Sequence, residues 1–378
     1  MTTDVIEQEA RSLLRKQRRV DSWFISRYGM NLYRGCAHAC AYCDGRAERY
    51  RVEGEFGREV AVKTNAAALL TRELDPARRR KPLKRAYVFL GGGVCDAYQP
   101  LEERYLLARQ ALEVIARHPF PVHVLTKSTL VERDFDLLRA VHGRQRAIVS
   151  MSFSTVDDEL ARRFEPGCAS PSERLATLAR AKGAGLGAGM YLLPVLPGLS
   201  DGATHIDQAL RAARAHELDF VVFGGLTLKG GRQQAHYLSV LEAHQPELRA
   251  RVDALYPGQR WGQARPGYYE RIERRFEQAA GRHQLAVRVP PALWSDLLDD
   301  NDRAVVVLEH MAYLSRLGGR SSSYQRAADA VAELERPLPE LRDELRRLPG
   351  VGPVTERLLR EVLESGSAED YERLLRRR

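Results

Sequence analysis

Three closely spaced cysteines, Cys36, Cys40 and Cys43, are the residues of this 378-residue chain whose type and spacing most clearly indicate chemistry. Three thiolates so close in sequence cannot all face one point from a regular helix or strand, so the spacing predicts a loop wrapped around a metal centre. Thiolates select iron–sulfur clusters, zinc or Cu(I) over harder cations. Three cysteines leave one iron of a [4Fe–4S] cluster open, whereas a structural zinc site has a fourth ligand, for which His38 is available.

The cysteine motif resembles the hallmark of the radical S-adenosylmethionine (SAM) superfamily, in which an aromatic residue, here Tyr42, stands directly before the third cysteine. The resemblance implies that Cys36, Cys40 and Cys43 hold a [4Fe–4S] cluster whose open iron is chelated by SAM. It also implies that the reduced cluster cleaves SAM to a 5′-deoxyadenosyl radical. Reduction requires an electron donor such as ferredoxin or flavodoxin.

The remaining composition suits such a cluster. Cys95 and Cys168 are isolated, and five cysteines in 378 residues do not make a disulfide framework. The segment 1–21 is basic and lacks an apolar core, and no later run is long or apolar enough to span a bilayer. We therefore expect a cytoplasmic protein without a membrane segment, and the length suggests two domains.

Strand-like and helix-like segments alternate from about residue 22 to residue 290. Apolar runs predict strands at 24–32, 85–90, 121–126, 146–153, 187–193 and 220–223, and helical periodicity predicts helices at 102–117, 130–141, 172–182, 204–216 and 233–243. This pattern predicts an α/β fold, a partial (βα)6 TIM-like barrel with a parallel sheet. Ligands bind at the carboxyl ends of such strands, which is where the cysteine loop follows the first strand.

Further local motifs, in their order along the chain, resemble the spore photoproduct lyase-related branch of the superfamily. They cover 92–102, 125–128, 165–174 and 193–201. In the family the glycine segment, here Gly91, Gly92 and Gly93, meets the methionine end of SAM, because missing side chains let the backbone approach a ligand. A plain turn at the end of a strand is the alternative. Asp96 follows, as a candidate for binding the SAM ammonium group or the substrate.

Lys127 ends a strand that is predicted to be buried, where a charge without a partner is costly. The resemblance makes its partner the carboxylate of SAM, and an ion pair with Asp134 or Asp136 is the alternative. Ser150 and Ser152 on the following strand are candidates for contacting the ribose or carboxylate of SAM. They can equally be core hydroxyls that bond to the backbone.

Cys95 and Tyr98 are the candidate catalytic residues. Spore photoproduct lyase returns a hydrogen atom from a cysteine in this segment, which aligns with Gly93, two residues before Cys95. Side chains two residues apart on an extended strand point to the same face of the sheet. Cys95 is therefore a substitute for that donor or else a buried structural cysteine. Tyr98 either stacks on a base and donates hydrogen, or packs beneath the next helix. Asp44 is a second departure, because the lyase has an aromatic residue there.

Residues 299–378 predict a separate all-α domain, with helices at 301–317, 322–335 and 339–348. The segment 348–359, Leu-Pro-Gly-Val-Gly-Pro-Val-Thr-Glu-Arg-Leu-Leu, resembles a helix–hairpin–helix element. Its backbone N–H groups would bind phosphate without reading base sequence. The candidate DNA-binding residues are Gly350, Val351, Gly352, Arg346, Arg347 and Arg357. A turn that merely joins packed helices is the alternative.

This domain is similar to the small N-terminal domain of family-X DNA polymerases, some of which remove a deoxyribose phosphate through a lysine Schiff base. The corresponding position is Leu358, and the domain contains no lysine, so we expect it only to grip DNA. It carries 14 arginines and 16 acidic residues, which give it a net charge of −2. Because the whole chain has a net charge of +9, the first 298 residues have a net charge of +11. Most electrostatic attraction to DNA is therefore expected from the barrel.

These observations favour a radical SAM enzyme that repairs or modifies DNA, in a lyase-like reaction of unspecified substrate. Two alternatives remain open at this stage. One is a radical SAM enzyme that acts on RNA, a peptide or a small molecule. The other is a non-catalytic DNA-binding protein with zinc or an iron–sulfur cluster.

Overall fold

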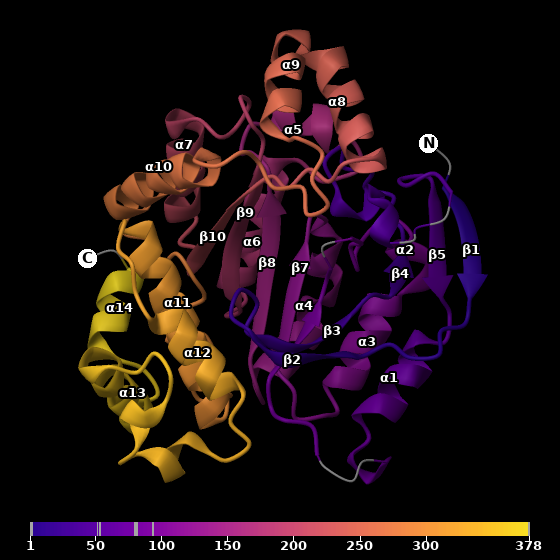
Figure 1. The fold of residues 1–378 in the computed structure, drawn as a ribbon. Helices are drawn as coiled ribbons and strands as arrows, with labels where there is room; N and C mark the ends of the chain where they lie inside the picture. Colours follow the sequence, from indigo (N-terminus) through magenta and orange to yellow (C-terminus); the bar gives the residue numbers. More distant parts are fainter. Residues whose placement is uncertain (1–2, 51, 53, 79–81, 93, 377–378) are drawn as a thin grey trace.

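The main sheet is a curled seven-stranded half-barrel, seen in a computed structural model that describes residues 3–50, 52, 54–78, 82–92 and 94–376 (Figure 1). Its order is β10-β9-β8-β7-β6-β3-β2. The strands are β2 (Arg15–Asp21), β3 (Ser26–Met30), β6 (Tyr87–Leu90), β7 (Val122–Thr126), β8 (Ala147–Phe153), β9 (Gly187–Val195) and β10 (Phe220–Gly225). All neighbours from β3 to β10 pair in parallel, which confirms the predicted six-strand partial barrel.

Strand β2 was not predicted. The sequence set residues 1–21 apart as a basic segment, whereas β2 pairs antiparallel with β3 at the edge of the main sheet. Farther towards the N-terminus, β1 (Asp4–Gln8) pairs with β5 (Glu59–Lys63), which also pairs with β4 (Tyr33–Arg34) in a small second sheet. This sheet lies beside the cysteine loop, because β4 ends two residues before Cys36.

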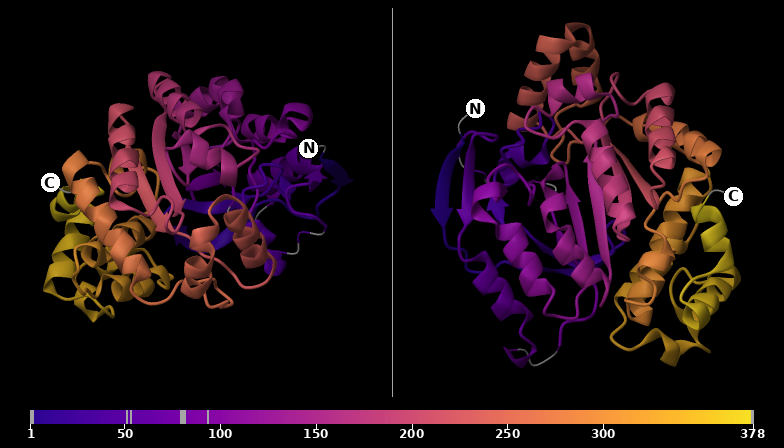
Figure 2. Two further views of the ribbon diagram at one scale, coloured as in Figure 1. Left: turned by 90° about the horizontal axis from the view of Figure 1, so that it is seen from above. Right: turned by 180° about the vertical axis from the view of Figure 1, so that it is seen from behind.

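Helices cover the convex side of the half-barrel (Figure 2). In chain order the barrel helices are α1 (Ala66–Leu74), α2 (Glu102–Tyr105), α3 (Leu107–Ile115), α4 (Phe135–His142), α5 (Asp158–Phe164), α6 (Pro171–Gly183), α7 (Ala203–Ala215), α8 (Arg232–His244), α9 (Pro246–Leu255) and α10 (Tyr268–His283). Strands buried on both faces are typical of parallel sheets, and β6 to β8 are almost wholly buried. Helices α8 and α9 lie instead at the carboxyl-end side of the strands, where a site is expected, and α8 contacts the end of the cysteine loop (Figure 1).

Aromatic side chains fill the concave side of the half-barrel. Phe24, in the turn between β2 and β3, stacks on Tyr191 with ring centroids 5.2 Å apart and lies 4.3 Å from Phe89. His123 lies among the same rings, where its Nδ1 donates to the Phe24 carbonyl oxygen at 2.9 Å and its Nε2 lies 2.8 Å from Ser150 Oγ. This packed layer occupies the middle of the barrel, and Phe24 and Phe89 also line the cavity that the cysteine loop borders.

The C-terminal domain consists of α11 (Asp300–Leu317), α12 (Tyr324–Ala332), α13 (Pro353–Ser365) and α14 (Glu369–Leu375). The helix predicted at 339–348 is wrong: the chain forms two short 3-10 turns, Leu338–Leu341 and Leu345–Arg347. A 3-10 turn places residues i and i+3 on one side, so Leu338 and Leu341 both reach the core from one turn. A continuous α-helix is not needed to bury this segment's leucines.

A buried ion pair joins the two regions. Arg27 of β3 donates two hydrogen bonds of 2.7 Å each to Asp302 of α11, and both side chains are almost fully buried. On the same helix, the ring nitrogens of His310 contact Ser22 O and Tyr371 Oη at 2.8 and 2.7 Å. Helix α11 is therefore fastened to the barrel by fully desolvated polar contacts. No helix in the described part of the chain is long and apolar enough to cross a membrane.

Replacing Asp302 by asparagine is expected to lower the free energy of unfolding by about 3 kcal/mol, because it leaves the Arg27 guanidinium buried without a countercharge. Asp300→Asn is the matched control, since Asp300 forms a half-exposed ion pair with Arg303 in the same helix turn. Thermal unfolding followed by circular dichroism measures both. Equal melting temperatures for the two variants would contradict the proposed fastening.

Candidate functional site

A cavity of about 260 Å³ lies at the carboxyl ends of β6, β7 and β8, with the cysteine loop as one wall. All three motif cysteines line it. The predicted residues that share this lining are Cys36, Cys40, Tyr42, Cys43, Gly92, Cys95, Asp96, Lys127 and Ser152. Segments that are far apart in sequence therefore meet at the edge of the sheet where the parallel-strand rule places a site.

The three thiols fit an iron–sulfur cluster in donor chemistry. Each cysteine of such a cluster binds a different iron, so the thiolates have to surround a space rather than meet at one point. Among the described residues, no three His, Cys, Asp or Glu side chains are grouped as ligands of a single ion. Burial raises the pKa of Cys36 and raises that of Cys43 to about 12, so metal binding has to displace protons from these thiols.

Arg46 fixes the shape of the cysteine loop. Its buried guanidinium donates to the carbonyl oxygens of Ala39, Cys40 and Phe56 at 2.8, 3.0 and 3.2 Å. Ala39 has a φ of +53°, so the loop takes a conformation that an L-residue adopts only when it is held. The sequence analysis missed Arg46, because one arginine after a cysteine motif carries no signal until its carbonyl partners are known.

His38, the candidate fourth ligand of the zinc alternative, lies between the cysteine loop and two neighbouring segments. Its Nδ1 lies 2.6 Å from the carbonyl oxygen of Gly167, and its Nε2 lies 3.2 Å from Asp96 Oδ2. Burial alone would lower the pKa of His38, but the Cys36 sulfur and the Asp96 carboxylate outweigh it and raise the pKa to about 10. Nδ1 thus contacts a backbone carbonyl oxygen and Nε2 faces the Asp96 carboxylate, so the ring links the cysteine loop to both neighbours.

Asp96 is the anchor at the centre of the cavity wall. Its carboxylate accepts hydrogen bonds from Thr126 Oγ1 and from the backbone N–H groups of Lys127 and Tyr98, each at 2.8 Å, and it also faces His38. Burial alone raises the pKa of Asp96, but the His38 contact and the backbone N–H groups hold it below the ordinary value. Asp96 therefore ties β7 to the cysteine loop.

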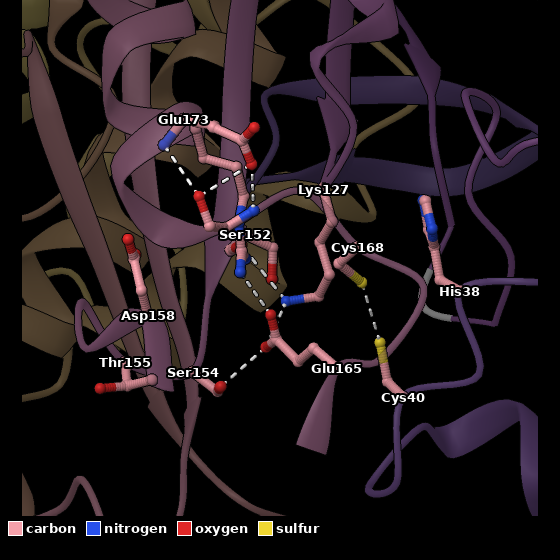
Figure 3. A network of polar contacts seen from close by, with 12 residues as sticks. His38, Cys40, Lys127, Ser152, Ser154, Thr155, Asp158, Glu165, Cys168 and Glu173 are labelled. Carbon is pink, nitrogen blue, oxygen red and sulfur yellow. Dashed lines mark hydrogen bonds and ion pairs between the residues drawn. The ribbon is translucent and has the colours of Figure 1, made fainter. Parts of the chain in front are cut away.

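Lys127 extends from the end of β7 into the cavity (Figure 3). Its Nζ donates to Glu165 Oε1 at 3.0 Å and to the carbonyl oxygen of Ser152 at 3.2 Å. The predicted alternative partners are wrong, because Asp134 and Asp136 both bind Arg109 instead. An ammonium group has three donors, so one N–H of Lys127 remains for a ligand.

Glu165 is the residue that the sequence analysis missed most clearly. It is fully buried and binds Arg174 Nη2 at 2.5 Å and Ser154 Oγ at 2.7 Å, and Tyr42 Oη also donates to it. Burial alone would raise the pKa of Glu165, but Arg174 and Lys127 outweigh it and hold the pKa far below the ordinary value. The motif at 165–174 contains both Glu165 and Arg174, but only the folded chain brings these two side chains together.

The two candidate serines of β8 have different surroundings. Ser152 lines the cavity, and its Oγ donates to the carbonyl oxygen of Leu193 at 3.0 Å. Ser150 is fully buried against His123 in the aromatic layer, so it lies among the core hydroxyls and away from the cavity. Its partner is a side chain rather than the predicted backbone.

The glycine segment lies at the edge of the cavity. Gly91 has a φ of +150°, and a Cβ there would come within 2.6 Å of the Leu125 carbonyl oxygen. A Cβ on Gly92 would lie 2.5 Å from the side-chain Oδ1 of Asn31, so close backbone packing accounts for Gly91, whereas the close neighbour of Gly92 is a side chain. Gly93 lies outside the described residues.

Of the two candidate catalytic residues, only Cys95 lines the cavity. It packs beside Cys36 and Phe56, and burial raises the pKa of its thiol to about 12. Tyr98 is fully buried and does not line the cavity. Its position therefore fits the alternative expectation, in which the ring packs in the core.

Two contacts around the cysteines were not foreseen. The sulfur of Cys168, isolated in sequence, lies 3.5 Å from that of Cys40. Asp44, at the position where the lyase has an aromatic residue, pairs with the buried Lys229 at 2.7 Å. Gln233 donates to both Asp44 and the carbonyl oxygen of Tyr42, at 3.1 and 2.9 Å. Helix α8 thereby holds the end of the cysteine loop.

The hairpin before α13 has the expected backbone. Gly350 has a φ of +83°, and a Cβ there would lie 2.6 Å from the amide nitrogen of Ala327. Ser323 Oγ donates to the Gly350 carbonyl oxygen at 2.8 Å, and Val351 is buried. Gly352 has open space around it and precedes Pro353, the first residue of α13.

The predicted arginines near the hairpin are exposed but paired. Arg346 lies 2.5 Å from Glu356, Arg347 lies 3.0 Å from Glu344, and Arg357 lies 3.7 Å from Asp370. Exposed pairs of this kind are weak and exchange readily for phosphate. The pairing fits the net negative charge of this domain, and in the hairpin itself the Val351 N–H donates to the Leu348 carbonyl oxygen at 3.1 Å.

The half-barrel with three thiols at its carboxyl edge defines a radical SAM-type protein, and comparison with known families agrees. The profile of the Radical SAM superfamily matches residues 30–225. The chain therefore belongs to the radical SAM superfamily. A second profile, that of a helix-hairpin-helix domain, matches residues 299–368.

Relatives share this region of the chain. An uncharacterized protein of Mycobacterium tuberculosis is 35% identical over 270 residues, which cover 70% of this chain and 77% of the relative. An uncharacterized protein of Methanocaldococcus jannaschii is 29% identical over 224 residues, covering 59% and 78%.

Solved structures of spore photoproduct lyase share the fold. A cysteine-to-serine mutant of that enzyme superposes with a TM-score of 0.53 at 17% identity, covering 74% of this chain and 79% of the lyase. The lyase complexed with dinucleoside spore photoproduct superposes with a TM-score of 0.50 over the same shares. At this identity the likeness concerns the fold alone.

Proposed function

We propose that this protein is a radical SAM enzyme that acts on DNA in a photoproduct-lyase-like repair or modification reaction. The observation that carries the proposal is that the three motif cysteines line the same cavity as Lys127 and Asp96, in a chain that also has a helix–hairpin–helix domain. The first half of this observation supports radical chemistry. The second half supports a nucleic acid as the substrate.

Different cavity residues would hold the iron–sulfur cluster and SAM. Cys36, Cys40 and Cys43 would ligate a [4Fe–4S] cluster, which with bound SAM supplies a 5′-deoxyadenosyl radical. Lys127 would donate its third N–H to the SAM carboxylate. Gly92 leaves room at the cavity edge for the methionine end of SAM.

Cys95 is the proposed hydrogen donor. Its thiol lines the cavity and stays protonated because of burial, so an S–H bond is available to a substrate radical. Asp96 and His38 hold the cavity wall beside Cys95 in place. A base in a duplex cannot reach this depth, so the target nucleotide has to be flipped out or distorted, while the hairpin holds phosphates elsewhere on the strand.

The test uses full-length protein reconstituted anaerobically, reduced with dithionite and supplied with SAM. Mass spectrometry quantifies 5′-deoxyadenosine with and without ultraviolet-irradiated DNA. We expect 5′-deoxyadenosine from the wild type, a change in its rate with irradiated DNA, and none from the Cys36/Cys40/Cys43→Ala variant. Iron and sulfide analysis accompanies each sample, because the chemistry depends on a loaded cluster.

Three results would count against the proposal. Equal 5′-deoxyadenosine formation with and without DNA would place the chemistry on another substrate, such as RNA, a peptide or a small molecule. Absence of 5′-deoxyadenosine from protein with a complete cluster would contradict an enzyme altogether. Stoichiometric zinc without iron or sulfide in anaerobically purified protein would indicate a binding protein.

A further inference from the structure

A second, larger hollow adjoins the cluster cavity. It has a volume of about 610 Å³ and lies between β2, the small sheet and the cysteine loop. Phe24, Phe89 and Gly92 line both hollows, so the two spaces adjoin at the aromatic layer. We call this second hollow the β2 groove.

The β2 groove is strongly basic. Arg15, Arg34, Arg49 and Lys63 line it, and Asp21 is the one carboxylate among the described lining residues. That carboxylate accepts the backbone N–H groups of Trp23 and Phe24 at 2.8 and 3.3 Å, so it is engaged within its own turn. The groove therefore presents an excess of positive charge beside the reaction cavity.

Three of these cations have no acidic partner. Within the described residues, neither Arg15, Arg34 nor Arg49 forms an ion pair, and all three are exposed. Their neighbours on β2 differ: Arg18 pairs with Glu333, and Arg19 pairs with Glu309 and Asp329. Unpaired arginines along a groove are what an anionic, repeating ligand requires.

Aromatic side chains accompany the charge. The Arg49 guanidinium lies 4.4 Å from the ring centroid of Trp261 and 5.3 Å from that of Tyr50. Arg260 lies 5.4 Å from Trp261 on the same loop. Trp261 is 55% exposed, which is unusual for a tryptophan that serves only packing. A cationic groove with an exposed aromatic ring matches sites that track a nucleic-acid backbone and stack its bases.

The groove also leads towards the C-terminal domain. A further hollow between β2 and α11 shares Gln17 and Asp21 with the β2 groove and is also lined by Gln325 of α12. The hairpin packs on the first turn of α12, through Ser323 and Gly350. Figure 1 shows β2 crossing between the small sheet and the C-terminal helices. The two hollows thus adjoin at Gln17 and Asp21, and the second one reaches α12, the helix on which the hairpin packs.

We propose that the β2 groove binds the sugar–phosphate backbone of a single nucleic-acid strand that runs from the hairpin across β2 to the cluster cavity. Arg15, Arg34 and Arg49 contact successive phosphates, and Trp261 stacks on a base outside the cavity. The inference rests on the proposed function in taking a nucleic acid as the substrate. It adds the route by which the target nucleotide reaches the cavity.

Fluorescence anisotropy with a labelled single-stranded oligodeoxynucleotide of about 16 nucleotides tests this route in reconstituted full-length protein. The groove variant replaces Arg15, Arg34 and Arg49 by alanine. At about 0.1 M salt we expect it to bind about 100-fold more weakly, with a log–log salt slope smaller by about 2, because each lost phosphate contact on a single strand contributes about 0.7 to the slope.

The matched control removes the same charge elsewhere. Arg117, Arg211 and Arg214 are exposed, lie on the convex helical side, and have no acidic partner among the described residues. Their triple alanine variant is expected to bind within about twofold of the wild type, since distant surface charges are screened at this salt concentration. Equal weakening in both triple variants, or no weakening in the groove variant, would overturn the proposed route.

Trp261 provides an independent measurement. Trp261→Ala is expected to weaken binding about tenfold without changing the salt slope, because stacking releases no counterions, and Trp261→Phe is expected to retain most affinity. Equal affinity of wild type and Trp261→Ala would remove Trp261 from the route.

The oligonucleotide measurement separates this inference from the proposed function. Loss of binding in the groove variant, in a protein that makes no 5′-deoxyadenosine, would uphold the groove and reject the enzyme. DNA-dependent 5′-deoxyadenosine formation that is identical in the wild type and the groove variant would uphold the enzyme and reject the groove.

Discussion

Glu165→Gln is expected to lower the melting temperature by about 10 °C. The substitution keeps the size of the side chain but leaves the buried Arg174 guanidinium and the Lys127 ammonium without their shared countercharge. Breaking a buried pair from one side costs about 3–5 kcal/mol. For a domain of this size, about 2–4 °C follows from each kcal/mol.

Glu173→Gln is the matched control for that variant. Glu173 lies eight residues away in the capping box of α6, where it accepts from Ser170 N at 2.7 Å, and it is exposed. Loss of a cap costs about 1 kcal/mol, so its melting temperature should fall by only a few degrees. A comparable fall in melting temperature in both variants, measured by calorimetry, would show that losing the Glu165 charge destabilises the fold no more than losing a helix cap.

The effect of Glu165→Gln also depends on pH. The folded protein holds the pKa of Glu165 far below its ordinary value of 4.5, so the ionised carboxylate stabilises the fold fully above that value. This contribution is lost as the pH falls below 4.5 towards the folded-state pKa. The difference in unfolding free energy between the wild type and Glu165→Gln should therefore be constant near neutrality and shrink in acid. A difference that grows in acid would contradict the assigned charge state.

Lys127→Met is expected to weaken SAM binding by about 30-fold or more while leaving cluster content unchanged. Removing one partner of a buried, hydrogen-bonded charge pair costs about 2 kcal/mol or more, and that cost corresponds to the stated change in affinity. Glu165 keeps Arg174, Tyr42 and Ser154 as partners, so the fold is expected to tolerate the change.

Isothermal titration of SAM into anaerobic, iron- and sulfide-quantified protein measures this prediction. Lys182→Met is the control, because Lys182 also pairs with one carboxylate, Asp219 at 2.6 Å, but lies at the end of α6 on the outer surface. Unchanged SAM affinity in Lys127→Met would mean that the ammonium serves only Glu165. Loss of iron from the variant would instead assign Lys127 to the cysteine loop.

The sequence alone determined the features that depend on short-range spacing. The three cysteines with Tyr42 identified the loop, because these candidate ligands all lie in one short stretch of the chain. The alternation of apolar runs and helical periods predicted the half-barrel, and the Pro-Gly-Val-Gly-Pro segment predicted the hairpin, in which the structure places Gly350 in the left-handed region. Each of these signals lies within a few residues or repeats along the chain.

Only the tertiary structure decided which side chains meet. Ser150 and Ser152 share a strand face, yet their depth along β8 places one in the aromatic layer and the other at the cavity. Strand β2 resembled a solvated basic segment, because an edge strand with one exposed face lacks an apolar run. The pairing of Lys127 with Glu165 joins segments 38 residues apart. Sequence spacing cannot rank such contacts, because packing of the whole barrel fixes which charges share a buried space.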